Sequence, residues 1–155
     1  MSDDKNLKNI IREEYAKCIS NPAYFIKKYG VIQHPIEGKI PFLLYDFQEK
    51  TLSEFIEHDY NIVLKARQLG MSTLVAAYSL WLMTFRSDKN ILVIATKQDT
   101  AKNLVTKVRF MHSNLPTWLR NACTEDNKLS LRYSNGSQIK AISSSEDAGR
   151  SEALS

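Results

Sequence analysis

The chain has 155 residues, 43% of them apolar and 25% charged, which is typical of an ordinary globular domain and excludes a disordered or fibrous protein. Its formal net charge of +4 suits a polyanionic partner such as a nucleic acid or a nucleotide. No apolar stretch approaches the roughly 18 residues of a membrane span, and the distant pair Cys18 and Cys123 indicates neither a disulfide framework nor a zinc site.

The N-terminal part of the chain is predicted to be mainly helical. A polar helix is expected over residues 4–19, and Asn21-Pro22 is a start signal for a second, short helix. Prolines and glycines break residues 31–45 into loop and short extended pieces. A third helix is expected over residues 46–58, with Asp46 as its N-cap.

From residue 61 the pattern changes to strands that alternate with helices. Residues 61–66 and 90–96 are short apolar runs that predict buried strands, and residues 74–85 and 99–115 predict helices. This alternation indicates βαβ units and a parallel sheet. A further pair of strands is expected around Asn135-Gly136, a strong hairpin signal. The predicted fold class is therefore α/β.

The turn after the first predicted strand has the position of a phosphate-binding loop. Such loops lie between a strand and a helix because backbone N–H groups at a helix N-terminus lack partners. An eight-residue phosphate loop has glycine first and sixth, lysine seventh, and serine or threonine eighth. Gly70 and Ser72 match the sixth and eighth positions, whereas Lys65 and Met71 replace the first glycine and the lysine.

The side chains of this turn can supply the chemistry of a phosphate site. Lys65 has a flexible stem that can fold its ammonium over the β- and γ-phosphates, and Arg67 can place a guanidinium against the γ-phosphate. Gly70 permits close approach of the backbone, and Ser72 offers a hydroxyl to Mg²⁺. The same residues also fit a plain βα connection, in which both cations are solvated and Ser72 or Thr73 caps the helix.

Motifs from Pro22 to the C-terminus, taken together, resemble one known family. They are Pro22-Ala-Tyr-Phe-Ile-Lys-Lys-Tyr, Ile32-Gln-His-Pro, Gly38-Lys-Ile-Pro-Phe, Leu44-Tyr-Asp-Phe-Gln48, Arg67-Gln68-Leu69-Gly70-Met71-Ser72-Thr73, Ile91-Leu-Val-Ile-Ala-Thr-Lys-Gln-Asp-Thr-Ala101, Asn135-Gly-Ser-Gln-Ile and Ser143-Ser-Ser-Glu-Asp-Ala-Gly-Arg150. In this combination the chain resembles the ATPase domain of phage terminase large subunits, the motors that package viral DNA.

The resemblance implies a fold and a set of cofactors. Residues 60–155 are expected to form an incomplete P-loop NTPase core of the additional-strand, RecA-like class with parallel strands, and residues 1–59 a helical segment that contacts adenine. ATP and Mg²⁺ are the implied cofactors. The residues expected to bind the nucleotide are Gln48, Lys65, Ala66, Arg67, Gln68, Leu69, Gly70, Met71, Ser72 and Thr73.

Individual roles also follow from the resemblance. Gln48 matches the family's adenine-contacting glutamine, and its amide carries both a donor and an acceptor for the base edge. Lys65 matches the lysine of a deviant Walker A loop, and Arg67 matches the loop arginine used on the γ-phosphate, so these two are the expected catalytic residues. Ser72 is the expected metal ligand.

The wider setting implied by the family is a viral DNA-packaging motor in the host cytoplasm, with no membrane association. It would use ATP hydrolysis to translocate double-stranded DNA into a prohead, as an oligomeric ring that works with a portal protein and a small terminase subunit. The sequence contains no apolar strand that ends in an acidic pair, which such ATPases need for Mg²⁺ and for water activation, and no nuclease domain.

In the family the acidic strand begins just beyond the position where this chain stops, so we expect a truncated motor domain that binds nucleotide weakly and hydrolyses it slowly or not at all. Two alternatives stay open. One is a helicase-like DNA translocase that shares the loop and the motif after the second strand. The other is a non-catalytic, basic α/β module that binds DNA or a protein partner.

Overall fold

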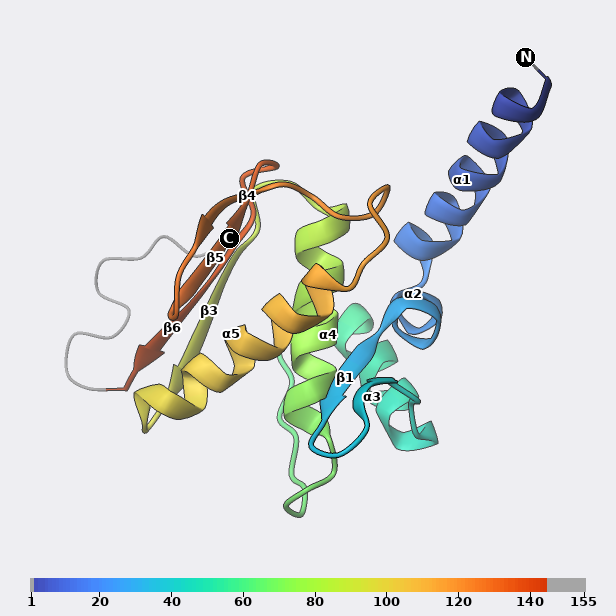
Figure 1. Ribbon diagram of the computed structural model, residues 1–155. Helices are drawn as coiled ribbons and strands as arrows, with labels where there is room; N and C mark the ends of the chain where they lie inside the picture. The colour runs from blue at the N-terminus through green and yellow to red at the C-terminus, as the bar shows by residue number, and fades with distance from the viewer. Residues whose placement is uncertain (1, 145–155) are drawn as a thin grey trace.

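The structure is a computed structural model that describes residues 2–144 (Figure 1). The resemblance motif that continues to Arg150 therefore lies outside the described residues from residue 145 onward. The elements are, in chain order, α1 (Ser2–Ser20), α2 (Pro22–Tyr29), β1 (Val31–His34), β2 (Gly38–Pro41), α3 (Asp46–Glu57), α4 (Met71–Phe85), β3 (Asn90–Ala95), α5 (Gln98–Ser113), β4 (Cys123–Asp126), β5 (Ser130–Tyr133) and β6 (Gln138–Ser143).

Local signals set the starts of α2 and α3. The Asn21 side chain accepts the Tyr24 N–H at 3.0 Å with Pro22 in the first turn, which confirms the predicted helix start. The prediction of Asp46 as the N-cap of α3 is wrong, because Tyr45 is the N-cap and Asp46 lies in the first turn. The Gln48 Oε1 accepts the Tyr45 N–H at 3.1 Å, so the third residue of the helix provides a hydrogen-bond partner for the backbone N–H of the N-cap residue.

The larger sheet is mixed, with the strand order β3-β6-β5-β4. β3 and β6 pair in parallel, from Asn90 opposite Gln138 to Ala95 opposite Ser143, whereas β5 is antiparallel to both β6 and β4. The expected α/β class is confirmed, but the expected parallel sheet is reduced to this one parallel pair within residues 2–144. The hairpin predicted around Asn135-Gly136 joins β5 to β6, with Gly136 at φ +84°.

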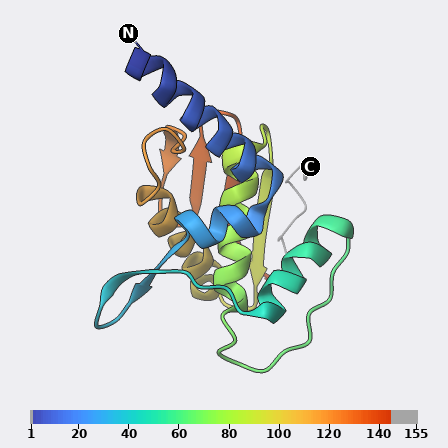
Figure 2. The ribbon, with the colours of Figure 1, turned by 90° about the vertical axis from the view of Figure 1, so that its right-hand side faces the viewer.

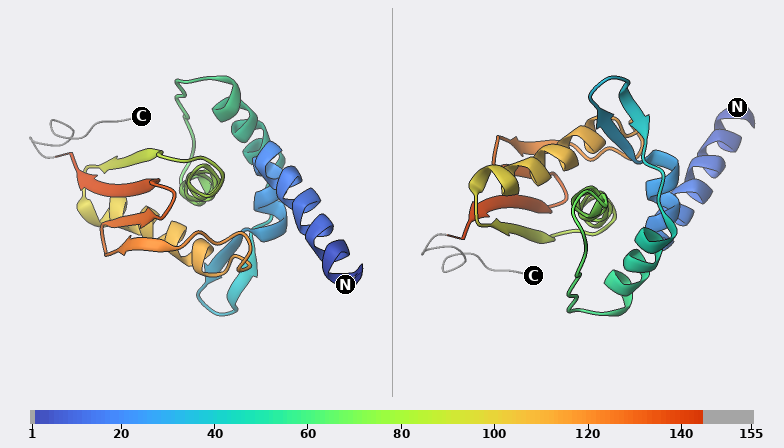
Figure 3. Two further views of the ribbon diagram at one scale, coloured as in Figure 1. Left: turned by 90° about the horizontal axis from the view of Figure 1, so that it is seen from above. Right: turned by 90° about the horizontal axis from the view of Figure 1, so that it is seen from below.

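The helix α4 lies at the centre of the fold. α5 lies against one face of the sheet, α4 packs on α5, and α2 and α3 pack on α4 from the opposite side (Figures 2 and 3). α4 begins at Met71, three residues before the predicted start, so Ser72 and Thr73 belong to its first turn. Its buried residues are Met71, Leu74, Ala76, Ala77, Ser79, Leu80, Trp81, Met83, Thr84 and Phe85.

The prediction of a buried strand over residues 61–66 is wrong. These residues have no regular secondary structure and are exposed, and the side chains of Ile62 and Leu64 are 100% exposed. An apolar run becomes a strand only where a neighbouring strand pairs with its backbone N–H and C=O groups. The described strands pair with one another, and none of them pairs with this segment. The apolar run over residues 61–66 therefore predicted a strand, but residues 2–144 contain no strand that pairs with it.

A cluster of polar groups joins α1 to α2. The Glu14 carboxylate accepts hydrogen bonds from Lys28 Nζ at 2.7 Å, from Tyr24 Oη at 2.9 and 3.0 Å, and from Tyr29 Oη at 2.9 Å. The Lys28 hydrogen bond, followed by those of the two tyrosines, lowers the pKa of Glu14 from 4.5 to about 2, against the opposing effect of burial. The charged form of Glu14 therefore stabilises the fold.

Replacing Glu14→Gln is expected to lower the free energy of unfolding near pH 7. Because the folded-state pKa of Glu14 is depressed, its contribution is complete above about pH 4.5 and is lost as the pH falls toward 2. The difference between the wild type and the variant should shrink over that interval in urea denaturation measured at a series of pH values. Glu13→Gln, at an exposed neighbouring position, is the matched control. A wild-type-to-variant difference that stays constant down to pH 2 would contradict this role of Glu14.

Candidate functional site

The loop before α4 has the backbone geometry of a tight turn into a helix. Gln68 and Gly70 have φ values of +64° and +68°, and Gly70 is the N-cap of α4. The Gly70 carbonyl accepts the N–H groups of Thr73 and Leu74, both at 3.0 Å. The preceding N–H groups of the first turn have no intrahelical acceptor, and the dipole of this 15-residue helix is positive at this end. The loop therefore offers a favourable position for an anion.

Gln48 holds this loop against α3. Its side chain is fully buried, with 0% exposure. Its Nε2 donates to the Leu69 carbonyl at 3.1 Å, while its Oε1 accepts the Tyr45 N–H at 3.1 Å. A Cβ on Gly70 would lie 2.8 Å from Gln48 Nε2, so this contact favours glycine at position 70 in addition to the positive φ. In this structure the Gln48 amide binds backbone groups of the protein itself, and because its side chain is fully buried, a contact with adenine requires the side chain or its surroundings to move.

The polar and charged side chains at this position are exposed, whereas Met71, the first residue of α4, is buried. Lys65, Arg67 and Ser72 are exposed at the surface. Met71, at the position of the usual lysine, is only 6% exposed and belongs to the hydrophobic core. A cation at this site therefore comes from the loop before the helix and not from position 71.

A cavity of about 810 Å³ lies between α3 and the loop. This volume is within the range of roughly 300–1,000 Å³ that is typical of small-molecule sites. The loop and the segment before it contribute Asn61, Ile62, Val63, Leu64, Lys65, Ala66 and Leu69, α3 contributes Phe47, Lys50, Thr51, Glu54 and Phe55, and α4 contributes Met71. Four of the ten predicted site residues thus meet at one cavity. The six that do not line it are Gln48, Arg67, Gln68, Gly70, Ser72 and Thr73.

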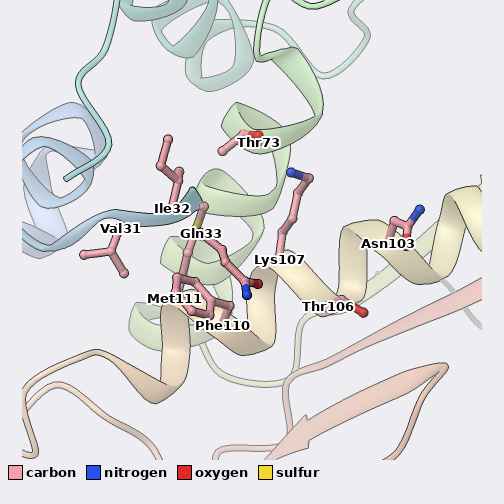
Figure 4. A pocket seen from close by; sticks show the side chains of 9 residues that line it. All are labelled: Val31, Ile32, Gln33, Thr73, Asn103, Thr106, Lys107, Phe110 and Met111. Atoms are coloured by element: carbon pink, nitrogen blue, oxygen red, sulfur yellow. The ribbon is translucent and has the colours of Figure 1, made fainter. Parts of the chain in front are cut away.

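A second cavity, of about 370 Å³, lies on the other side of the first turn of α4 (Figure 4). It is lined by Val31, Ile32 and Gln33 of β1, Thr73 of α4, and Asn103, Thr106, Lys107, Phe110 and Met111 of α5. Thr73 is the one predicted site residue that lines it. The other eight were missed, because they come from elements far apart in the sequence and no motif joins them.

Three further findings bear on function. Within residues 2–144, no group of three or more His, Cys, Asp and Glu side chains is placed to hold a metal ion. Over the same residues, no helix has both the length and the apolar character needed to cross a membrane. No protein-family model matches the chain.

Replacing Gln48→Ala is expected to lower the free energy of unfolding by about 2–4 kcal/mol, because it empties a fully buried position and leaves the Tyr45 N–H and the Leu69 carbonyl without their partner. Chemical denaturation measures this directly. Gln98→Ala, at an exposed position, is the matched control and should change stability by no more than about 0.5 kcal/mol. Equal, small effects of both substitutions would mean that Gln48 does not hold the loop.

Proposed function

We propose that this chain is the ATP-binding part of a DNA-packaging motor of the terminase large subunit type, which couples ATP hydrolysis to the translocation of double-stranded DNA into a prohead. The observation that carries the proposal is the arrangement around the N-terminus of α4. There a left-handed Gly70 begins the helix, and Lys65 and Arg67 are exposed in the loop before it. These are the features that phosphate recognition requires at a helix end.

Each loop residue has a chemical role in this proposal. The N–H groups at the start of α4 bind phosphate oxygens, and the Lys65 ammonium neutralises charge on the β- and γ-phosphates. Arg67 stabilises the negative charge that develops on the γ-phosphate oxygens during transfer. Ser72 provides a hydroxyl ligand for Mg²⁺, whose bound charge offsets that of the phosphates.

The position of the cation supports the deviant Walker A loop that the sequence resembles. The side chain at position 71 is a methionine that packs in the core, so it supplies no charge to a phosphate. Lys65 lines the larger cavity and is exposed. Double-stranded DNA, a portal protein, a small terminase subunit and an oligomeric ring are the proposed partners and assembly, and they rest on the sequence resemblance. The expected hydrolysis is slow, because the sequence contains no apolar strand that ends in an acidic pair.

ATP with Mg²⁺ is expected to raise the Tm of the chain. At a free concentration about ten times the Kd, mass action stabilises the fold by about 1.4 kcal/mol, which corresponds to roughly 3–6 °C for a chain of this size. Lys65→Ala should abolish this shift, because it removes the cation that faces the phosphates. Differential scanning fluorimetry over a series of ATP concentrations measures both effects.

Lys128→Ala is the matched control, because Lys128 is an exposed lysine between β4 and β5 and does not line the loop cavity. It should shift with ATP as the wild type does. An unchanged Tm of the wild-type chain at millimolar ATP, or an equal shift in Lys65→Ala, would count against the proposed function.

A further inference from the structure

We propose that copies of this chain associate head to tail, with the C-terminal end of α3 of one copy bound in a groove that α1 and Trp118 form on the next. This groove, which we call the α1 groove, has a volume of about 340 Å³, and its lining residues are Lys8, Asn9, Ile11, Arg12, Tyr15 and Trp118. The inference goes beyond nucleotide binding. The ring in the proposed function rests on the sequence resemblance, whereas this contact follows from exposed residues of the structure.

The walls of the α1 groove are held in place by the core. The Tyr15 ring packs edge-on against Phe85, with the ring centroids 5.2 Å apart, and the Trp118 ring packs in the same way against Tyr29 at 5.8 Å. The polar cluster around Glu14 fixes α1 to α2. A group that enters the groove therefore meets ordered walls, so binding loses little conformational entropy on this side of the contact.

The apolar side of α1 continues beyond the part of the helix that packs on the body. Cys18, near the C-terminal end of α1, is 0% exposed, whereas Leu7 and Ile10 are 56% and 55% exposed. Figures 1 and 2 show the N-terminal half of α1 extending away from the rest of the molecule. Leu7 lies one turn before Ile11 on the same side of the helix, so it continues the apolar surface of the α1 groove. Contiguous exposed apolar surface of this kind is typical of a protein contact.

The charges of the α1 groove indicate an acidic occupant. Lys8 and Arg12 line it, and no aspartate or glutamate is among its lining residues. Ile11, Tyr15 and Trp118 add apolar and aromatic surface beside these cations. Complementary charge fixes which partner binds, and a buried apolar side chain supplies the affinity. The groove therefore suits a helix that presents a carboxylate next to an exposed apolar side chain.

The C-terminal end of α3 has these features. α3 contains four carboxylates and one lysine, which gives it a charge of −3. Ile56 is 55% exposed, and its neighbour Glu57 is also exposed. The last turn of α3 contains no basic residue, although the negative end of the helix dipole lies there and favours a nearby cation. Arg12 of a second copy would supply that cation, and Ile56 would enter the groove.

The two surfaces lie on different parts of the chain, which makes the contact head to tail. In Figures 1 and 2 the N-terminal half of α1 points away from α3. Each copy in such a contact keeps one unoccupied surface, so further copies can add until a ring closes. Glu54 and Phe55 of α3 line the larger cavity. The contact would therefore place a neighbouring copy beside the proposed phosphate site.

Sedimentation velocity of the whole chain over a wide range of protein concentrations tests this contact. The wild type should change from a monomer to larger species as its concentration rises. Arg12→Glu and Glu57→Arg should each weaken self-association about tenfold, because each places like charges opposite one another. An equimolar mixture of the two variants should associate as the wild type does, since each variant offers the other a complementary surface. Both positions are exposed, so the Tm of each variant should match that of the wild type.

Lys17→Glu and Glu13→Arg are the matched controls. Each reverses one exposed charge on α1 at a position that does not line the groove, and both should associate as the wild type does. A wild type that stays monomeric at every concentration overturns the inference, and so does a mixture of Arg12→Glu and Glu57→Arg that fails to associate. Neither result changes the expected Tm shift with ATP. A chain that associates as described but shows no Tm shift with ATP overturns the proposed function alone.

Discussion

The candidate site depends on one buried amide, that of Gln48. It forms hydrogen bonds with the backbone on both sides, to Tyr45 at the start of α3 and to Leu69 in the loop, and so it fixes where the loop begins its turn into α4. Because the amide is 0% exposed, water cannot replace a lost partner at low cost. The same amide restricts position 70, since a Cβ there would lie 2.8 Å from its nitrogen. A residue 22 positions before Gly70 thus determines the shape of the loop.

Side-chain hydrogen bonds also fix the C-terminal end of α4, and the direction of the helix axis at its N-terminal end depends on them. Carbonyl groups in the last turn of a helix lack intrahelical partners. In α4, Asn135 Nδ2 donates to the Met83 carbonyl at 2.8 Å and Asn121 Nδ2 donates to the Thr84 carbonyl at 3.1 Å. Asn135 belongs to the turn between β5 and β6, so a hydrogen bond from the sheet holds the C-terminal end of the helix in place. Residues 37 and 52 positions away from their partners in the sequence therefore fix the C-terminal end of the helix whose N-terminus faces the loop.

The sequence predicted the features that depend on neighbouring residues. The N-cap of α2 at Asn21 and the glycine turn at Gly136 were both predicted, because one or two side chains decide them. The strand over residues 61–66 was predicted wrongly and β4 was missed, because pairing between distant segments decides whether a strand forms. The smaller cavity was missed for the same reason, since Gln33 and Lys107 meet only through the packing of α5 on β1. The motif alone could not show that the Gln48 amide is already bonded.

The two cavities on either side of the first turn of α4 differ in the order of their walls and in the charges that line them. The larger one has a wall without regular structure and is lined by two lysines, Lys50 and Lys65, and one carboxylate, Glu54, so its charged lining is positive by one and suits a flexible anionic group. The smaller one has packed walls and apolar surface, so it is suited to a rigid, planar group. Ordering the loose wall costs conformational entropy, whereas filling the preformed cavity costs little. In the nucleotide complex that we propose, phosphate groups would therefore be bound at the larger cavity at the cost of ordering its wall.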